Sequence, residues 1–248
     1  MVTWTEGIVL ENKSWTTKLH SLRVKATIQP FSAGQFTQLA LKIDGELVSR
    51  PFSLVNAPDD PVLDFYFIHV PDGVLSPRLA SLKAGDTVQV AEKATGLLTL
   101  EQLPPANKLF LLATGTGVGP FLSILKTETV WQQFDQVCLL HAVRFAEELS
   151  YSDTIKQLQH DHADQFRYVT VVSRESHHTS LGGRIPDLIE DDTLSATTGM
   201  TFDDNSQVLI CGNPGMIQET MDVLTKHGLK RHTRREPGQI SIEKYWSN

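Results

Sequence analysis

The sequence predicts a protein of two domains, an antiparallel β-barrel over residues 1–101 and an α/β domain with a parallel sheet over residues 102–248. Three observations lead to this fold class. Before residue 100, short runs alternate apolar and polar side chains, as strands with one buried face do. A connector with two prolines, EQLPPANK, then follows. After it, nearly continuous apolar runs alternate with helix-like segments, which is typical of a parallel sheet covered on both faces.

The first part contains the elements of a small barrel. Its strand-like runs are EGIVLENKSWTTKLHSLRVKAT, FTQLALKI, LDFYFIHV and DTVQVAEK. Turn residues such as Asp44-Gly45 and Asp72-Gly73 separate them. The one helix expected here is short and runs from Pro77 to Leu82. Many short strands with few helices favour a barrel or a sandwich, and of the two we expect a barrel.

The second part contains four strand–helix pairs and a final strand. The expected strands are KLFLLAT, QVCLLHAV, FRYVTVVS and QVLICG. The expected helices are PFLSILKTETVWQQF, LSYSDTIKQLQHDH, RIPDLIEDDTL and GMIQETMDVLTKHG. The tail QISIEKYWSN begins with another strand-like stretch, and the polar segment from His177 to Gly183 is expected to be a loop.

Composition and charge narrow the class of protein. The 248 residues are 40% hydrophobic and 21% charged, as in an ordinary globular protein. The formal charge of −7 argues against nucleic acid as a partner. Cys138 and Cys211 lie in apolar runs, so we expect buried thiols, and two cysteines cannot form a four-cysteine iron–sulfur site. With no signal-peptide pattern and no run of membrane-spanning length, we expect a cytoplasmic monomer without a membrane partner.

A glycine-rich segment, residues 114–120 (TGTGVGP), follows a strand and opens a helix. Glycines allow positive φ and let the backbone approach a phosphate closely. Pro120 stands where the usual dinucleotide fingerprint has a third glycine, and a proline suits the first turn of a helix. The segment therefore predicts an intact nucleotide loop of another kind. The alternative is a tight turn that binds nothing.

A second glycine turn and three arginines support the prediction of a nucleotide-binding site. The turn from Cys211 to Met216 also joins a strand to a helix, so both turns should lie at carboxyl ends of neighbouring strands. The second strand ends in Arg144, where an NAD site has an acid, and a cation is compatible with a 2′-phosphate. Arg174 and Arg184 belong to the same predicted edge. Taken singly each arginine suggests a surface salt bridge, but as a group they favour a phosphate.

The barrel contains a separate candidate motif. In residues 50–54 (RPFSL), an arginine, an aromatic ring and a hydroxyl on one extended strand could meet a diphosphate, a flat ring and a ring nitrogen. Residues 74–79 (VLSPRL) open the short helix, whose first backbone N–H groups could reach the same diphosphate. The alternative is that Phe52 belongs to the core and Arg50 is solvated.

Taken in this order, the motifs resemble those of the ferredoxin–NADP reductase family. Arg50, Phe52 and Ser53 match its Arg-x-Tyr-Ser motif, residues 115–120 match its Gly-Thr-Gly-x-x-Pro loop, and residues 211–216 match its Cys-Gly-x-Pro-x-Met turn. The resemblance covers nearly the whole chain. It is closest to the bacterial subclass, through RPFSLVNAPDDP, VPDGVLSPRL, VVSRE, GRIP and the terminal Tyr245-Trp246.

The resemblance implies that the barrel binds FAD, that the second domain binds NADP(H), and that hydride passes between nicotinamide C4 and flavin N5. It makes Ser53 the candidate hydrogen-bond partner of N5 and Cys211 the candidate residue beside the nicotinamide, and it implies no metal. The implied FAD-binding residues are Arg50, Pro51, Phe52, Ser53, Tyr66, Phe67, Ile68, His69, Val74, Leu75 and Ser76. The implied NADP(H)-binding residues are Thr116, Val143, Arg144, Ser173, Arg174, Arg184, Gly212 and Asn213.

Two features depart from the family pattern. Phe52 replaces the usual tyrosine, so ring stacking is kept and one hydroxyl is lost. Ser247 and Asn248 follow the terminal aromatic pair, of which either Tyr245 or Trp246 is implied to lie near the flavin. A tail that only packs on the protein is the alternative.

The resemblance also implies an acidic electron carrier, ferredoxin or flavodoxin, with NADPH as donor. Residues 226–235 (KHGLKRHTRR) hold five formal cations and no acid, and we predict that they form part of the docking face. A solvated helix end is the alternative. Two other functions remain open: a reductase of free flavins or of a partner oxygenase, and a non-catalytic electron-transfer or sensory flavoprotein, although relatives of the last kind usually carry an additional cysteine cluster.

Overall fold

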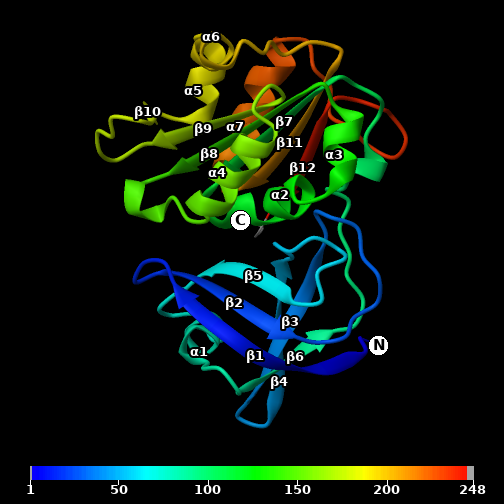
Figure 1. The fold of residues 1–248 in the computed structure, drawn as a ribbon, viewed down its shortest axis with the longest axis vertical. Helices are drawn as coiled ribbons and strands as arrows, with labels where there is room; N and C mark the ends of the chain where they lie inside the picture. The colour runs from blue at the N-terminus through cyan, green and yellow to red at the C-terminus, as the bar shows by residue number, and fades with distance from the viewer. Residues whose placement is uncertain (1, 245–248) are drawn as a thin grey trace.

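The computed structural model describes residues 2–244 and has the predicted fold, an antiparallel β-barrel below an α/β layer structure (Figure 1). Six barrel strands form one sheet in the order β4-β3-β6-β1-β2-β5. The sheet curls until Leu54, just beyond β4, makes an antiparallel bridge with Phe65 of β5. The strands are β1 Trp4–Ser14, β2 Leu19–Lys25, β3 Phe36–Ile43, β4 Glu46–Ser53, β5 Leu63–Ile68 and β6 Thr87–Ala91.

The second sheet is parallel and has the order β10-β9-β8-β7-β11-β12. The chain enters at β7, fills the sheet on one side through β8, and then crosses to β11 on the other. The strand order therefore reverses between β7 and β11, the kind of point at which open α/β sheets bind ligands. The strands are β7 Lys108–Thr114, β8 Gln136–Val143, β9 Phe166–Val172, β10 Leu181–Gly182, β11 Ser206–Gly212 and β12 Ile240–Lys244.

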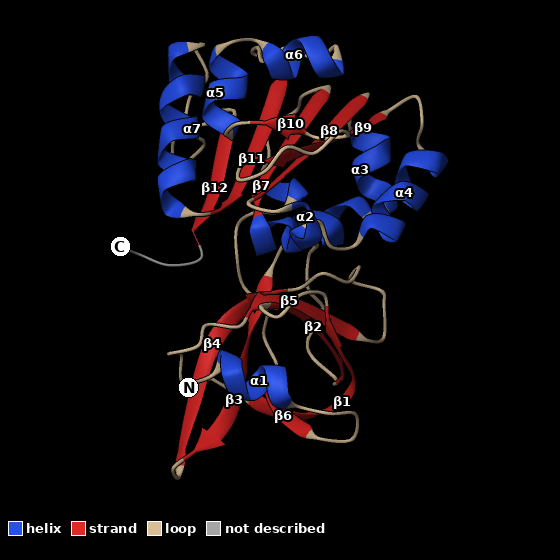
Figure 2. Ribbon diagram, turned by 90° about the vertical axis from the view of Figure 1, so that its left-hand side faces the viewer, coloured by secondary structure: helices blue, strands red, loops and turns tan. Residues whose placement is uncertain are grey.

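Helices lie on both faces of the parallel sheet, as predicted (Figure 2). The first of them, α2, lies on the side of the sheet that faces the barrel, close to β5 (Figure 2). The helices are α1 Ser76–Ser81, α2 Val118–Leu125, α3 Glu128–Gln133, α4 Ser152–Asp161, α5 Ile185–Glu190, α6 Thr193–Thr198 and α7 Pro214–Lys226.

Three sequence expectations about local structure were wrong. The expected helix over residues 120–134 is two helices, because Thr127 turns extended and its hydroxyl donates to the Ile124 carbonyl oxygen at 2.7 Å. The expected helix after Arg184 is also two, divided where Asp192 adopts a left-handed conformation with φ 59°. The expected loop from residue 177 to 183 contains the short strand β10, which pairs with the end of β9.

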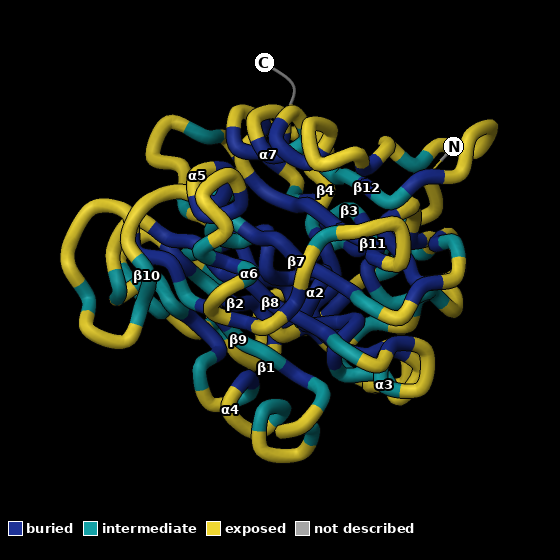
Figure 3. Tube along the Cα trace, turned by 90° about the horizontal axis from the view of Figure 1, so that it is seen from above, coloured by how far each residue is buried: buried dark blue, intermediate teal, exposed yellow. Residues whose placement is uncertain are grey.

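The cores of the two domains meet. Figure 3 shows the central strands β7, β8 and β11 as buried and the outer loops as exposed. Phe121 of α2 is fully buried in an apolar cluster that includes Val55, Tyr66 and Leu98 from the barrel side. One continuous apolar cluster thus connects the barrel to the nucleotide-loop helix.

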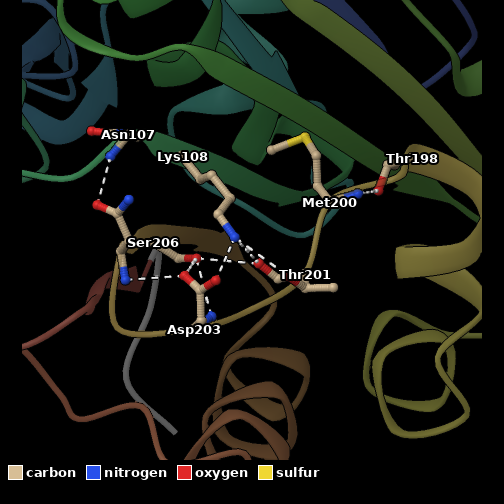
Figure 4. A network of polar contacts seen from close by, with 8 residues as sticks. Asn107, Lys108, Thr198, Met200, Thr201, Asp203 and Ser206 are labelled. Carbon is tan, nitrogen blue, oxygen red and sulfur yellow. Dashed lines mark hydrogen bonds and ion pairs between the residues drawn. The ribbon is translucent and has the colours of Figure 1, made fainter.

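A polar network fixes the opposite edge of the parallel sheet, where the strands begin (Figure 4). Lys108, at the start of β7, donates through Nζ to the Asp203 carboxylate at 2.5 Å and to the Thr201 carbonyl oxygen at 3.0 Å. The Asn107 N–H donates to the Asn205 side chain at 3.1 Å. These contacts hold the starts of β7 and β11 together. The two glycine turns follow the carboxyl ends of the same strands.

Candidate functional site

The two glycine turns are in direct contact, as their positions in the sequence predicted. The Asn213 N–H, after β11, donates to Thr114 Oγ1, at the end of β7, at 2.9 Å. Gly117 lies so close to β11 that a Cβ atom there would be 2.4 Å from the Cys211 carbonyl oxygen. Gly212 has φ +135°, a conformation open to glycine, and a Cβ there would be 2.1 Å from Thr114 Oγ1. Glycine is therefore required at both places for the turns to touch.

Asn213 also begins the helix that follows. Its side-chain oxygen accepts from the N–H groups of Gly215 at 2.9 Å and Met216 at 3.1 Å. Pro214 occupies the first helical position, where its missing N–H costs nothing. The sequence Asn-Pro-Gly-Met thus folds as a capped helix start that aims the remaining backbone N–H groups of α7 toward the nucleotide loop.

A buried histidine on β8 contacts the backbone of the first glycine turn, residues 114–120. His141 is fully buried, and its Nε2 lies 3.0 Å from the Gly115 carbonyl oxygen. Because a carbonyl only accepts hydrogen bonds, Nε2 carries the proton of a neutral ring. Within residues 2–244, Nδ1 is buried without a hydrogen-bond partner. Burial lowers the pKa of His141 from 6.5 to about 4, although the contact with Gly115 opposes the shift.

This histidine should make the stability of the protein pH-dependent. The folded state keeps His141 neutral down to about pH 4, whereas the unfolded chain takes up a proton below about 6.5. Stability is therefore full above pH 6.5 and falls as the pH drops to 4, by about 3 kcal/mol at 1.36 kcal/mol per pKa unit. Denaturant unfolding of the wild type and of His141→Gln at pH 4 and pH 7 measures this. If both proteins lose the same stability at pH 4, another group is responsible.

The edge formed by the two turns opens into a cavity of about 370 Å³, which we call the nucleotide pocket. It extends from the strand ends of the parallel sheet to the end of β5 in the barrel. Its lining contains the predicted residues Thr116, Val143, Arg144, Ser173, Arg184, Gly212 and Asn213. It also contains Thr114 and Gly115 of the predicted nucleotide loop, Met216 of the second glycine turn and the predicted flavin residue Ile68. Sequence reasoning did not select the remaining lining residues, which are Lys18, Leu19, Ala142, Glu148, Gly183 and Ile185.

Two of the three predicted arginines line this pocket, and the third, Arg174, lies outside its lining. Arg144 and Arg184 line it, and both are exposed. Arg174 is exposed beside them, with its backbone N–H donating to the Arg144 carbonyl oxygen at 2.9 Å. Glu148 holds the turn at Arg144, because its carboxylate accepts from the Arg144 N–H at 2.8 Å. Arg184 pairs with Glu219 at 2.5 Å, a surface contact that an incoming anion can replace.

A second cavity of about 370 Å³, which we call the flavin pocket, lies over the barrel. It has apolar walls and a few polar groups, the usual composition of a site for a flat cofactor. The predicted lining residues are Arg50, Pro51, Phe52, Ser53, Tyr66, Phe67, Ile68, Val74, Leu75 and Ser76, together with Thr116 of the nucleotide loop. The lining also contains Phe36, Val70, Gly73, Glu243 and Lys244.

Two polar side chains that line the flavin pocket, Ser76 and Tyr66, make hydrogen bonds within the protein. The Ser76 hydroxyl accepts from the Val70 N–H at 3.0 Å and closes the turn before α1. The hydroxyl of Tyr66 is directed to the other domain, where it donates to Ser150 Oγ at 2.8 Å, and burial raises its pKa above the usual range. His69 lies outside the lining and stands edge-on to His20, with ring centroids 6.2 Å apart.

Sequence reasoning missed Glu243, the acidic residue of β12. It stands opposite Cys211 in the parallel register of β11 and β12, and its Oε1 lies 3.5 Å from Ser53 Oγ. Burial raises the pKa of Glu243 from 4.5 to about 7, and the hydrogen bond from Ser53 limits the shift. The one signal for it in the sequence is an acid in an otherwise strand-like run, ISIEK, directly before the aromatic tail.

The flavin and nucleotide pockets adjoin, because Ile68 and Thr116 line both. Cys211 is fully buried in β11, between Glu243 on one side and Ala113 on the other. The predicted tail residues Tyr245 and Trp246 lie outside the described residues. Within residues 2–244 there is no cluster of three potential metal ligands, and no helix is long and apolar enough to cross a membrane.

Comparisons with known proteins agree with this arrangement. The oxidoreductase FAD-binding domain family matches residues 8–94, and the oxidoreductase NAD-binding domain family matches residues 111–222. The flavodoxin/ferredoxin–NADP reductase of Escherichia coli is 46% identical over 99% of this chain and 100% of its own length. The ferredoxin–NADP reductase of Pseudomonas aeruginosa is 36% identical over 95% of each chain.

A solved structure gives the same result in three dimensions. The ferredoxin NADP⁺ reductase of Neisseria gonorrhoeae, with bound FAD and NADP, superposes with a TM-score of 0.92 at 33% identity. The match covers 99% of this chain and 100% of that chain. Together with the two adjoining pockets, these similarities show that the chain belongs to the flavodoxin/ferredoxin–NADP reductase family.

Proposed function

We propose that the protein transfers hydride between NADPH and bound FAD, and single electrons between FAD and a ferredoxin or flavodoxin. The observation that carries the proposal is that the two pockets adjoin at Ile68 and Thr116, so rings held in each can meet. The names of the relatives support the choice of carriers. We assign FAD to residues 1–101 and NADP(H) to residues 102–248, and we propose that the protein acts as a monomer in the cytoplasm.

The residues of the flavin pocket fit FAD. Its apolar walls, with Phe52 and Phe67 edge-to-face at 5.8 Å, suit a flat aromatic ring system. Arg50 is exposed at the mouth of the pocket, where a guanidinium can pair with a diphosphate. We propose that Arg50 holds the diphosphate and that the backbone from Val74 to Ser76 completes that part of the site.

The residues of the nucleotide pocket fit NADPH. The glycine turns present backbone N–H groups at helix N-termini, which is the usual way to bind a pyrophosphate. We propose that Arg144, Arg174 and Arg184, with Ser173, surround the 2′-phosphate. Thr116 then lies on the nicotinamide side, because it is the loop residue that also lines the flavin pocket.

The protein contributes position rather than acid–base catalysis to the hydride step. When bound, FAD supplies the redox chemistry that links a two-electron donor to a one-electron acceptor. Ser53 Oγ, 6% exposed, offers a hydrogen bond at the inner end of the flavin pocket. Glu243, with a pKa of about 7, can hold or release a proton at Oε1, next to Ser53 Oγ, at neutral pH. Cys211, the β11 residue in register with Glu243, is fully buried.

We propose residues 226–235 as part of the carrier-docking face. The segment contacts the first residue of β12, the strand whose last residues, Glu243 and Lys244, line the flavin pocket. Arg231 bridges to Ile240, and the His232 N–H donates to the Ile240 carbonyl oxygen at 2.7 Å, at the start of the strand that carries Glu243. Arg231, Arg234 and Arg235 are all exposed. Exposed cations of this kind attract an acidic carrier through their charge.

Replacing Arg231, Arg234 and Arg235 together with alanine should slow reduction of an acidic ferredoxin or flavodoxin and weaken the salt dependence of that rate, because steering is electrostatic. Reduction of FAD by NADPH should be unchanged. A matched control replaces Lys25, Lys42 and Lys156, which are exposed elsewhere on the surface. If carrier reduction keeps its rate and its salt dependence in the arginine variant, the segment is not the docking face.

An anaerobic visible spectrum tests the proposed function directly. The purified protein should show flavin bands that bleach quickly with NADPH and slowly with NADH. A colourless protein would contradict the assignment of Arg50 to Ser53. A yellow protein that neither nucleotide reduces would contradict the assignment of the nucleotide loop and favour a non-catalytic flavoprotein. Flavin lost during purification but accepted as a substrate would favour a free-flavin reductase.

A further inference from the structure

A buried polar cluster joins the two domains next to the place where the two pockets adjoin. It has a barrel part, Trp15, Ser21, Asp64 and Tyr66, and a part from the other domain, Ser150 and Tyr151, which directly precede α4. Ser21, Tyr66, Ser150 and Tyr151 are each less than 8% exposed. A set of polar groups that is buried between two domains is costly unless its hydrogen bonds are made, so its geometry is narrowly defined.

The hydrogen bonds of the cluster form a chain that leaves the barrel at Ser21, passes through the Tyr151 hydroxyl and returns to the barrel at Asp64. Trp15 Nε1 donates to Ser21 Oγ at 2.7 Å, and Ser21 Oγ lies 2.6 Å from the Tyr151 hydroxyl oxygen. The Tyr151 hydroxyl in turn lies 3.3 and 3.4 Å from the two carboxylate oxygens of Asp64. Because an ionised carboxylate only accepts, Tyr151 donates to Asp64 and Ser21 donates to Tyr151. The tyrosine hydroxyl thus connects two barrel strands, β2 and β5, to the other domain.

Tyr151 is held in an unusual backbone conformation. Its φ of 60° and ψ of 22° lie in the left-handed region, which is rare for a bulky residue. Its ring packs between two barrel residues, with centroids 4.9 Å from Trp15 and 5.3 Å from Tyr66. A strained conformation persists only where the surroundings determine it strongly. The barrel therefore takes part in fixing the backbone just before α4.

A second set of contacts fastens α2, the helix that begins at the nucleotide loop. Ser123 Oγ donates to the Asn56 carbonyl oxygen at 2.6 Å, and Lys126 Nζ donates to the Val55 carbonyl oxygen at 2.9 Å. Val55 and Asn56 follow directly after the flavin motif of residues 50–54. Burial lowers the pKa of Lys126, and the charge of Asp64 opposes this shift, so the two groups stabilise each other's ionised form across the interface.

Both sets of contacts lie on the elements that carry the shared pocket residues. Side chains of β5 alternate, so Asp64, Tyr66 and Ile68 share one face while Leu63, Phe65 and Phe67 belong to the barrel core. Asp64 and Tyr66 bond across the interface, and Ile68 lines both pockets. Thr116, the other shared residue, lies two positions before α2, the helix that Ser123 and Lys126 fasten.

We propose that Tyr151 and Lys126 are positioning residues: they fix the orientation of the nucleotide domain on the barrel, and with it the approach of the nicotinamide to the flavin. This inference rests on the proposed hydride transfer. A displacement of about 1 Å between reacting groups can cost about a hundredfold in rate. The residues touch neither pocket, so their effect on hydride transfer must come through orientation.

The test compares Tyr151→Phe, Lys126→Met and the double variant with the wild type as FAD-loaded proteins. Tyr151→Phe keeps the ring packing and removes only the hydroxyl, and Lys126→Met keeps most of the side-chain stem. Anaerobic stopped-flow reduction by NADPH should show a limiting rate at least tenfold lower in the double variant, a larger deuterium isotope effect with NADPH labelled at C4, and an unchanged dissociation constant for NADP⁺. The control is Tyr168→Phe, whose hydroxyl makes no hydrogen bond to the barrel within residues 2–244.

A distance measurement tests the orientation without relying on activity. Cys138 and Cys211 are fully buried, so spin labels can be attached to cysteines introduced at the exposed positions Lys42 and Ala196, one on each domain. Pulsed electron resonance should give one narrow distance in the wild type and a broader distribution in the double variant. An unchanged limiting rate in the double variant overturns the inference, as does a slower rate with an unchanged distance distribution. A wild type that NADPH does not reduce contradicts the proposed function instead, and the distance measurement still decides whether the contacts set the orientation.

Discussion

Replacing Gly117 with alanine is expected to slow the reduction of bound FAD by NADPH by about a hundredfold. A Cβ atom at this position would lie 2.4 Å from the Cys211 carbonyl oxygen and 2.7 Å from its carbonyl carbon. Both are backbone atoms of a buried strand, so neither can turn aside as a side chain would. Since Cβ atoms do not approach heavy atoms within 3.0 Å, the loop must move by at least about 0.6 Å.

The movement would displace Thr116, the loop residue that lines both pockets, and so the place where the nicotinamide meets the flavin. A shift of about 1 Å at a reacting centre costs about a hundredfold. The measurement is the limiting rate of anaerobic flavin reduction, with the FAD content of the variant as a check on the barrel. Gly119→Ala is the matched control, because its Cβ would meet only Val55 Cγ2 at 3.4 Å and alanine favours the helix. A Gly117→Ala protein that reduces its flavin at the wild-type rate would show that the loop and β11 are not in the tight contact described.

Replacing Arg174 or Arg184 with alanine is expected to lower kcat/KM for NADPH by ten- to a hundredfold, with little change for NADH. The two nucleotides differ only in the 2′-phosphate, and a guanidinium paired with a phosphate supplies roughly 1.4 kcal/mol for each factor of ten. Arg144 lines the same pocket and should behave similarly. Arg184 pairs with Glu219 at 2.5 Å, and this ion pair must break before Arg184 can bind the phosphate. The loss of kcat/KM for NADPH should therefore be smaller for Arg184→Ala than for Arg174→Ala.

The ratio of kcat/KM values for NADPH and NADH is the quantity to measure, since it cancels any general loss of activity. Arg167→Ala serves as the control, because that guanidinium donates to the Ala163 carbonyl oxygen at 2.9 Å, at the start of β9 rather than at its end. Equal losses with both nucleotides would remove these arginines from the 2′-phosphate site.

Much of this architecture could be predicted from the sequence because the signals are local and periodic. The alternating runs predicted β1, β2, β3, β5 and β6, and β4 was expected only as the extended strand of the motif at residues 50–54. The continuous apolar runs predicted β7, β8, β9 and β11. The two glycine turns could be placed side by side because parallel strands end at one edge, and β7 and β11 are indeed neighbours. Arg144 could be placed at this edge of the sheet by its position after a strand, and it lines the nucleotide pocket.

The residues that the sequence did not predict depend on contacts between distant segments. Glu243 is an ordinary strand acid until β12 pairs with β11 and brings it within 3.5 Å of Ser53, 190 positions earlier in the chain. His141 has no local pattern, since its role depends on the Gly115 carbonyl oxygen above β8. The division between α2 and α3 was hidden because Lys126 and Thr127 have no helix-breaking side chain. In the folded chain, the Thr127 hydroxyl bonds to the Ile124 carbonyl oxygen and Lys126 bonds to Val55 in the barrel, and neither contact has a pattern in the sequence.

The apolar cluster that runs from the barrel into α2 has a consequence for how this protein unfolds. Each half has an apolar cluster of its own, but Val55, Tyr66 and Leu98 bury their side chains together with Phe121 in a third cluster that the two halves share. Separating the halves would expose this surface on both, and the free energy of that exposure links their melting. Calorimetry should therefore record one heat-absorption peak whose calorimetric and van't Hoff enthalpies agree. Each half matches a separate domain family, yet the two would then unfold as a single cooperative unit. A half taken from another protein would have to reproduce the residues of the shared apolar cluster.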